Sequence, residues 1–148
     1  MTARHVLFAA VWLAMALGWP LGASAQAIFS DGGLALRGYD PVAYFVDGRA
    51  RPGEPEWTAE WDGAEWRFSS ADNRDAFVAA PEDYAPQYGG FCAWAVSQGY
   101  TAPTNPHAWA IVDGRLYLNV TRRVQRRWER DAQAHIARAD ANWPDLRD

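Results

Sequence analysis

The pattern of hydrophobic and polar residues predicts two β-hairpins, and the alternation is regular in the first of them. In Glu56–Ser69, tryptophan, alanine and phenylalanine alternate with polar residues on both sides of Asp62-Gly63. Farther along, Ala108–Val112 and Arg115–Asn119 flank Asp113-Gly114. A period of two marks a strand with one buried face, and Asp-Gly favours the tight turn that joins antiparallel strands.

Helical patterns lie between and after the hairpins. Ser70 can cap a helix that runs to about residue 80, and Pro81–Pro86 is expected to add a further turn. The compact apolar segment Phe91–Ser97 predicts a short buried helix. Asp40 followed by Pro41 suits the N-cap and first position of a short helical turn.

The tail of the chain, Thr121–Asn142, predicts one amphipathic helix. Its apolar residues recur at near-helical spacing and continue just past its end, at Val124, Trp128, Ala132, Ile136, Ala139 and Trp143. The predicted fold class is therefore α+β, with a small antiparallel sheet from two β-hairpins, helices packed on that sheet and a C-terminal amphipathic helix.

The N-terminus has the pattern of a secretory signal peptide over residues 1–25. An almost wholly apolar stretch, Val6–Leu21, precedes the small-residue cleavage site Ala23-Ser24-Ala25. The stretch is short for a membrane span, so we expect a periplasmic or secreted protein with no stable membrane anchor after cleavage. Residues 26–148 are long enough for a single domain.

Charge is distributed unevenly along the chain. The formal net charge is −4, and none of the basic residues is a lysine. Residues 26–114 carry 5 arginines against 13 acidic residues, whereas residues 115–148 carry 8 arginines against 5 acidic residues. An acidic chain is a poor nucleic-acid binder. The arginines of the tail predict a solvated helix face, with an anion-binding patch as the alternative.

The only cysteine, Cys92, follows Gly89-Gly90 and precedes an apolar, aromatic run. Three interpretations are open. It is a small buried hydrophobic residue, a metal ligand, or a thiol whose pKa is lowered by the start of a helix. A CxxC motif, which would indicate a disulfide oxidoreductase, is absent.

Several ordered motifs resemble exported members of the YHS domain family. The opening motif is Gly38–Phe45, and the middle of the YHS domain is similar to Trp66–Ser70, Asn73–Phe77 and Pro81–Pro86. The exported subgroup also resembles the chain at Gly89–Ala93, Val112–Asn119 and Trp143-Pro144. The family is related to TRASH-type metal-binding domains, so the resemblance implies the handling of copper or another soft metal. The chain departs from the metal-type pattern, because Ser69, Asn73 and the Asp40 segment stand at the cysteine positions.

A metal site near Cys92 is the leading functional hypothesis. Cys92, His107 and Asp40 are the predicted ligands, because a site of thiolate, imidazole and carboxylate suits Cu(II), which we favour, or Zn(II). Such a site has one ligand fewer than a structural zinc site. It is therefore expected to be open or weak, or to be completed by a second molecule. The oligomeric state is left open.

A second hypothesis needs no metal. Tyr39, Tyr44 and Tyr88 could line a small pocket, which would make the chain a small-ligand or protein-interaction module with Cys92 in its core. A third hypothesis is a thiol-dependent enzyme in which His107 is the base for Cys92. We expect a binding protein rather than an enzyme.

Overall fold

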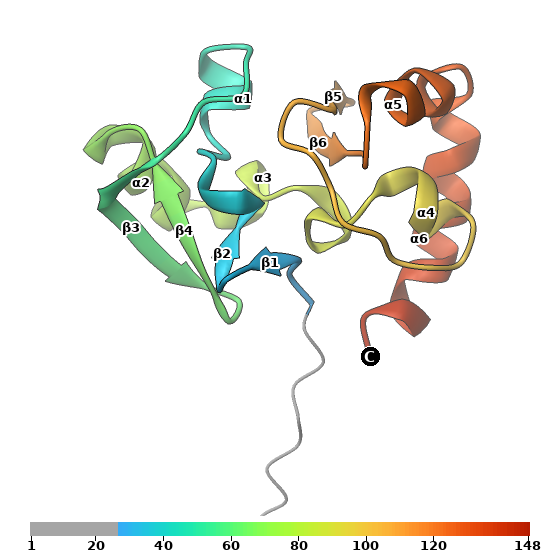
Figure 1. Cartoon of the computed structure of the whole chain (residues 1–148), viewed down its shortest axis with the longest axis horizontal. Coiled ribbons are helices and arrows are strands. Elements are labelled where there is room, and N and C mark those ends of the chain that lie inside the picture. The colour runs from blue at the N-terminus through green and yellow to red at the C-terminus, as the bar shows by residue number, and fades with distance from the viewer. Residues whose placement is uncertain (1–26) are drawn as a thin grey trace, which may run out of the picture.

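The computed structural model describes residues 27–148 (Figure 1). The signal peptide predicted over residues 1–25 lies outside this range. Within residues 27–148, no helix combines the length and apolar composition that crossing a bilayer requires.

Two sheets form, and the α+β class is confirmed. The larger sheet has the strand order β1-β2-β4-β3 and comprises β1 (Ser30–Asp31), β2 (Leu34–Ala35), β3 (Glu54–Trp61) and β4 (Ala64–Phe68). The predicted hairpin is β3–β4, and its turn residues Asp62 and Gly63 have the positive φ values that join antiparallel strands tightly. Strand β2 adds a parallel pair with β4, so this sheet is mixed.

The second predicted hairpin also forms, but in a sheet of its own. It pairs β5 (Trp109–Val112) with β6 (Arg115–Leu118). The sequence analysis expected both hairpins in one sheet. The structure instead places the β5–β6 pair with the C-terminal helices, apart from the larger sheet (Figure 1).

The helices follow the predicted order. They are α1 (Ala43–Val46), α2 (Ala71–Ala79), α3 (Pro81–Tyr84), α4 (Ala93–Ser97), α5 (Arg122–Glu129) and α6 (Ala132–Leu146), with 3-10 turns at η1 (Leu36–Gly38) and η2 (Gln87–Gly90). Ser70 caps α2 as predicted, because its hydroxyl accepts a hydrogen bond from the Asn73 N–H.

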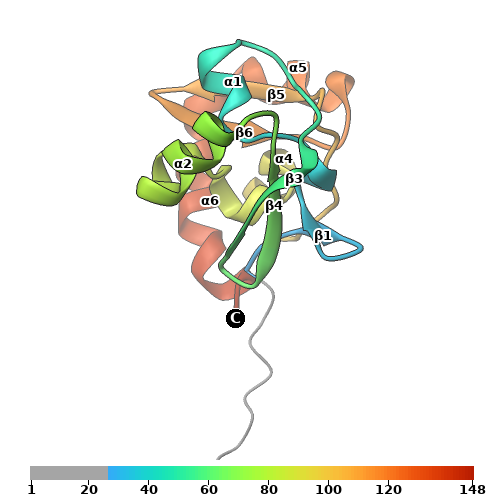
Figure 2. The same cartoon turned by 90° about the vertical axis from the view of Figure 1, so that its left-hand side faces the viewer.

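The predicted tail helix is divided in two. Asp131, with φ −150° and ψ 56°, leaves the helical conformation between α5 and α6. Helix α5 can then lie beside β5 while α6 crosses α4 (Figures 1 and 2). One straight helix could not pack against both, which is why the predicted continuous stripe is broken.

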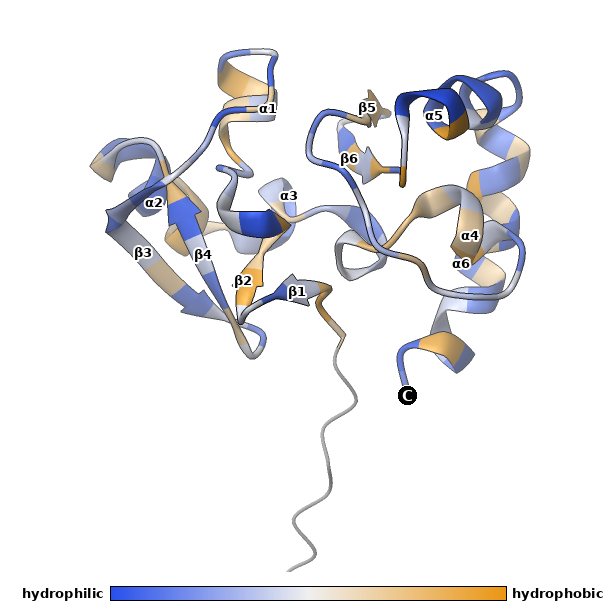
Figure 3. Cartoon of the chain, viewed as in Figure 1, coloured by the Kyte–Doolittle hydropathy of each residue, from blue (hydrophilic) through white to orange (hydrophobic). Residues whose placement is uncertain are grey.

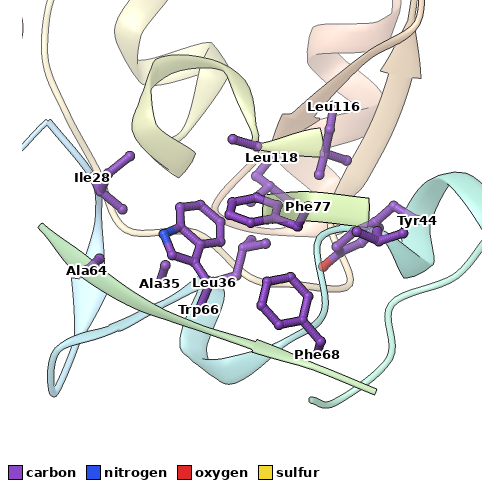
Figure 4. Packing of buried hydrophobic residues seen from close by; sticks show 12 residues of the cluster. Ile28, Ala35, Leu36, Tyr44, Ala64, Trp66, Phe68, Phe77, Leu116 and Leu118 are labelled. Carbon is purple, nitrogen blue, oxygen red and sulfur yellow. The ribbon is translucent and has the colours of Figure 1, made fainter. Parts of the chain in front are cut away.

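Strand β6 separates two apolar cores. Leu116 and Leu118 point into the main core, where Trp66, Phe68 and Phe77 pack together (Figure 4). Tyr117, on the opposite face of the strand, packs into a second core with Trp128 and other residues of the C-terminal half. The alternation of side chains along one strand therefore joins the two halves of the domain.

The first described residues are part of the packed structure. The Phe29 N–H donates to the Gly89 carbonyl oxygen at 2.8 Å, and Ile28 is 4% exposed in the main core. A Cβ atom on Gly89 would lie 1.6 Å from the Ala27 carbonyl oxygen. Gly89 is therefore required by the close passage of residues 27–29.

We predict that Gly89→Ala destabilises the protein strongly. The new methyl group would displace Ala27 and with it Ile28, whose burial is worth about 2 kcal/mol. Gly48→Ala is the matched control, because Gly48 has nearly the same φ, +63° against +60°, and nothing within 4 Å of its Cβ position. Urea unfolding should show a free energy of unfolding about 2 kcal/mol lower for Gly89→Ala than for Gly48→Ala. Equal values would contradict this account of residues 27–29.

Candidate functional site

Cys92 lies in the interior, immediately before α4. The residue is 0% exposed, and its sulfur lies 3.6 Å from Asn119 Oδ1. Burial raises the pKa of the Cys92 thiol, although backbone N–H groups, with Ala95 contributing most, act in the opposite direction. The shift is opposite to the one that the helix start predicts, because loss of solvation outweighs the helix.

Asn119 is a buried polar residue that the sequence analysis did not single out. Its Oδ1 atom accepts the Trp94 N–H, while its own backbone pairs with Ala108 and Asn105. The residue thus ties the end of β6 to the start of α4 and to the loop that carries His107. Its Nδ2 atom is buried without a protein partner. The signal in the sequence was an asparagine at the end of the predicted strand Arg115–Asn119, where its amide can bond to neighbouring loops.

Asp40 is also buried, and its carboxylate is occupied. Oδ1 accepts from the N–H groups of Val42 at 2.8 Å and Ala43 at 3.3 Å. Oδ2 accepts from the Ser69 N–H and hydroxyl and from Asn73 Nδ2, at 2.7 to 2.8 Å. The three positions that the YHS resemblance equated with cysteines thus form one hydrogen-bonded cluster. A carboxylate offers about four lone-pair sites, so metal coordination by Asp40 would require some of these bonds to break.

His107 is exposed and lies against Tyr39. The Tyr39 hydroxyl and His107 Nε2 are 3.3 Å apart, and the two rings meet edge to face at 5.4 Å. The His107 N–H donates to Asn105 Oδ1, which fixes the turn that presents the imidazole.

Tyr44 supports the same region from the interior. Its hydroxyl donates to the Pro106 carbonyl oxygen at 2.8 Å, and its ring packs edge to face on Trp109. Burial raises the pKa of Tyr44 above its ordinary value, so the hydroxyl remains a donor at neutral pH. Tyr39 and Tyr44 therefore both contact the segment that carries His107. The predicted tyrosine pocket stays a prediction.

Tyr88 lies elsewhere. Its hydroxyl donates to Asp140 on α6 at 2.8 Å, and burial raises its pKa. It lines a broad cleft of about 590 Å³, together with Trp61, the α3–η2 segment and the β5–β6 turn. The charged side chains of that cleft are of both signs: Glu82, Asp83, Asp113 and Arg115.

A second, smaller cleft opens beside His107. Its volume is about 290 Å³, and it is lined by His107, Trp109, Arg122, Gln125 and Arg126. Gln125 holds α5 against β5, because its Nε2 atom donates to the Trp109 carbonyl oxygen at 2.6 Å and to Glu129 Oε1 at 3.0 Å. We call this the His107 cleft. Its walls come from β5, the preceding loop and α5.

The three predicted metal ligands have separate partners. Cys92 contacts Asn119, His107 contacts Tyr39, and Asp40 is bound by Ser69 and Asn73. In the described part of the chain, no group of three or more histidine, cysteine, aspartate or glutamate side chains is arranged to hold a metal ion. The copper or zinc site stays a prediction.

Comparison with known proteins gives no relatives: no protein-family model, curated protein or solved structure matches the chain. The resemblance to the YHS family likewise stays a prediction, and functional inference must come from the geometry of the sites.

We predict that Cys92 reacts with alkylating reagents only after unfolding. The buried, protonated thiol should label slowly in native buffer at pH 7.5 and rapidly in denaturant, as measured by mass spectrometry. Rapid native labelling would support the thiol-enzyme hypothesis and contradict the interior position of Cys92.

The same burial predicts a pH dependence of stability. The thiol pKa is raised above 9.0 in the folded state, so above that pH the unfolded chain loses its proton first. The free energy of unfolding should then fall by up to about 1.4 kcal/mol per pH unit. Urea unfolding between pH 7 and pH 10 should show this component in the wild type and not in Cys92→Ala. Identical profiles would contradict the raised pKa.

We predict that Asp40→Asn lowers the free energy of unfolding by about 3 kcal/mol. An amide offers one acceptor atom instead of two, and it turns a donor towards donors that the carboxylate now satisfies. Asp47→Asn is the control, because Asp47 forms a surface ion pair with Arg51 that is worth at most about 1 kcal/mol. Similar urea midpoints for the two variants would show that the Asp40 cluster is not essential.

Proposed function

We propose that this chain is an exported, non-catalytic binding protein whose small ligand occupies the His107 cleft. The observation that carries the proposal is the convergence of an imidazole, an indole and two guanidinium groups around one open cleft. These groups come from the loop before β5, from β5 and from α5, and their side chains line the cavity.

The cleft is built on rigid support. Tyr44 and Asn119 bond to the backbone of the loop between residues 105 and 108 from two sides. Trp109 is packed on Tyr44, while Gln125 fixes α5 against the Trp109 backbone. A preformed site loses little conformational entropy when a ligand binds.

Its size indicates a small ligand. Its volume of about 290 Å³ is close to the lower limit of about 300 Å³ for small-molecule sites. The cleft suits a compact molecule or one end of a larger one. The proposal keeps the metal-free class of the sequence analysis, with Cys92 as an interior residue, but places the ligand in a cleft that Tyr39, Tyr44 and Tyr88 do not line.

The leading hypothesis of the sequence analysis, a copper site near Cys92, makes a different prediction. It requires stoichiometric uptake of Cu(II) that Cys92→Ser abolishes. The interior position of Cys92 and the occupied carboxylate of Asp40 favour the His107 cleft instead.

A binding screen tests the proposal. The purified protein is titrated calorimetrically with neutral, cationic and anionic small molecules and with Cu(II) and Zn(II). We expect a ligand whose affinity falls about fivefold or more in His107→Ala, because one hydrogen bond is worth about 1 kcal/mol. The variant changes an exposed side chain and should fold normally.

His135→Ala is the matched control. His135 lies on α6, where it contacts Ser97 and Arg138 and does not line the cleft. Ligands that bind both histidine variants as tightly as the wild type would place the binding site elsewhere. Uptake of Cu(II) that depends on Cys92 and not on His107 would replace the proposal with the copper hypothesis.

A further inference from the structure

The charged side chains that line the His107 cleft are both basic. Arg122 and Arg126 line it from α5 and His107 faces it from the loop, whereas no carboxylate is among its lining residues. Glu129 accepts a hydrogen bond from Gln125, one of the lining residues. Figure 3 shows α5 mostly in the hydrophilic colour, and Trp128 is the buried residue of this helix.

Arg122 and Arg126 are unpaired within the part of the chain that the structure describes. The four ion pairs within residues 27–148 use Arg37, Arg51, Arg67 and Arg74, all in the first half of the domain. On α5, Arg127 stacks over the Trp94 ring, but neither Arg122 nor Arg126 has a hydrogen bond or ion pair within the described residues. Their guanidinium groups are free to bind a ligand.

The position of Arg122 strengthens the local positive potential. Helix α5 begins at Arg122 after the cap Thr121, and its first turn contains no acidic residue. A helix N-terminus carries partial positive charge, so an arginine there is on the electrostatically unfavourable end. A bound anion would be attracted by both charges.

Arg122 and Arg126 are also correctly spaced to act together. Residues four apart on a helix are neighbours on one face, so both side chains line the same cleft. The guanidinium group presents a planar set of donors that matches the oxygens of phosphate and carboxylate groups. The half-buried Trp109 ring provides an apolar wall beside them.

We infer that the ligand of the His107 cleft is an anion, and that Arg122 and Arg126 bind its phosphate or carboxylate oxygens. The inference rests on the proposed function, because it names the ligand class of the same site. Two sources share this chemistry, the free inorganic ion and an anionic group on a small organic molecule.

Inorganic phosphate and phenyl phosphate are the probes, titrated calorimetrically at constant ionic strength. In Arg122→Gln/Arg126→Gln the affinity for both should fall about tenfold or more, since two charge-assisted contacts are lost. Arg123→Gln/Arg130→Gln is the matched control: it removes the same charge from exposed positions that do not line the cleft, and it should bind like the wild type. Tighter binding of phenyl phosphate assigns the site to an organic anion, and tighter binding of inorganic phosphate assigns it to the free ion.

Three outcomes would overturn the inference. Equal losses in the two double variants would show attraction by net charge alone, and unchanged affinity in both would place the anion elsewhere. If neither phosphate binds the wild type while a neutral or cationic ligand of the screen binds in a His107-dependent manner, the anion inference fails and the proposed function stands. If no ligand depends on His107, the proposed function itself fails.

Discussion

The candidate site depends on the hydrogen bonds that the buried carboxylate of Asp40 accepts. Asp40 is 0% exposed and receives hydrogen bonds from the start of α1, from Ser69 at the end of β4 and from Asn73 in α2. A buried carboxylate is stable only with such donors, so these bonds fix the segment from Tyr39 to Tyr44 against the larger sheet. That segment then supports the loop of His107 through the two tyrosine hydroxyls.

Asn119 fixes the loop of His107 from the other half of the domain. It follows β6, whose alternating side chains enter both apolar cores, and its backbone pairs with Asn105 and Ala108 on either side of His107. The loop is thereby held between the two cores. The geometry of an exposed site is thus set by two buried polar residues, neither of which lines the cleft.

The parts of this fold that could be predicted from the sequence depend on neighbouring residues. The β3–β4 hairpin follows from alternation around Asp62-Gly63, and the β5–β6 hairpin follows from the turn signal Asp113-Gly114 between two short segments. The start of α2 follows from Ser70. The parallel pairing of β2 with β4 could not be predicted, because a two-residue strand has no period to detect. The burial of Cys92 was one of the three interpretations of its motif, but its contact with Asn119, 27 residues away, could not be predicted, because it joins segments that are distant in the sequence. For the cleft, one local signal existed: Arg122 and Arg126 lie one turn apart with no acidic residue in the first turn of α5.

By size alone, the ligand would be assigned to the larger cleft beside Tyr88. The charges that line the two clefts favour the His107 cleft instead. The larger cleft combines three carboxylates with Arg115, so its charged groups can compensate one another, and the Tyr88 hydroxyl is already bonded to Asp140. In the His107 cleft, the two arginines repel each other and lie in a chain with a surplus of acidic residues. Like charges that lie close together without a counter-ion destabilise the folded state. An anion bound between the two arginines removes that repulsion. The smaller cleft therefore holds positive charges that an anionic ligand can neutralise. In the larger cleft, the carboxylates and Arg115 already compensate one another.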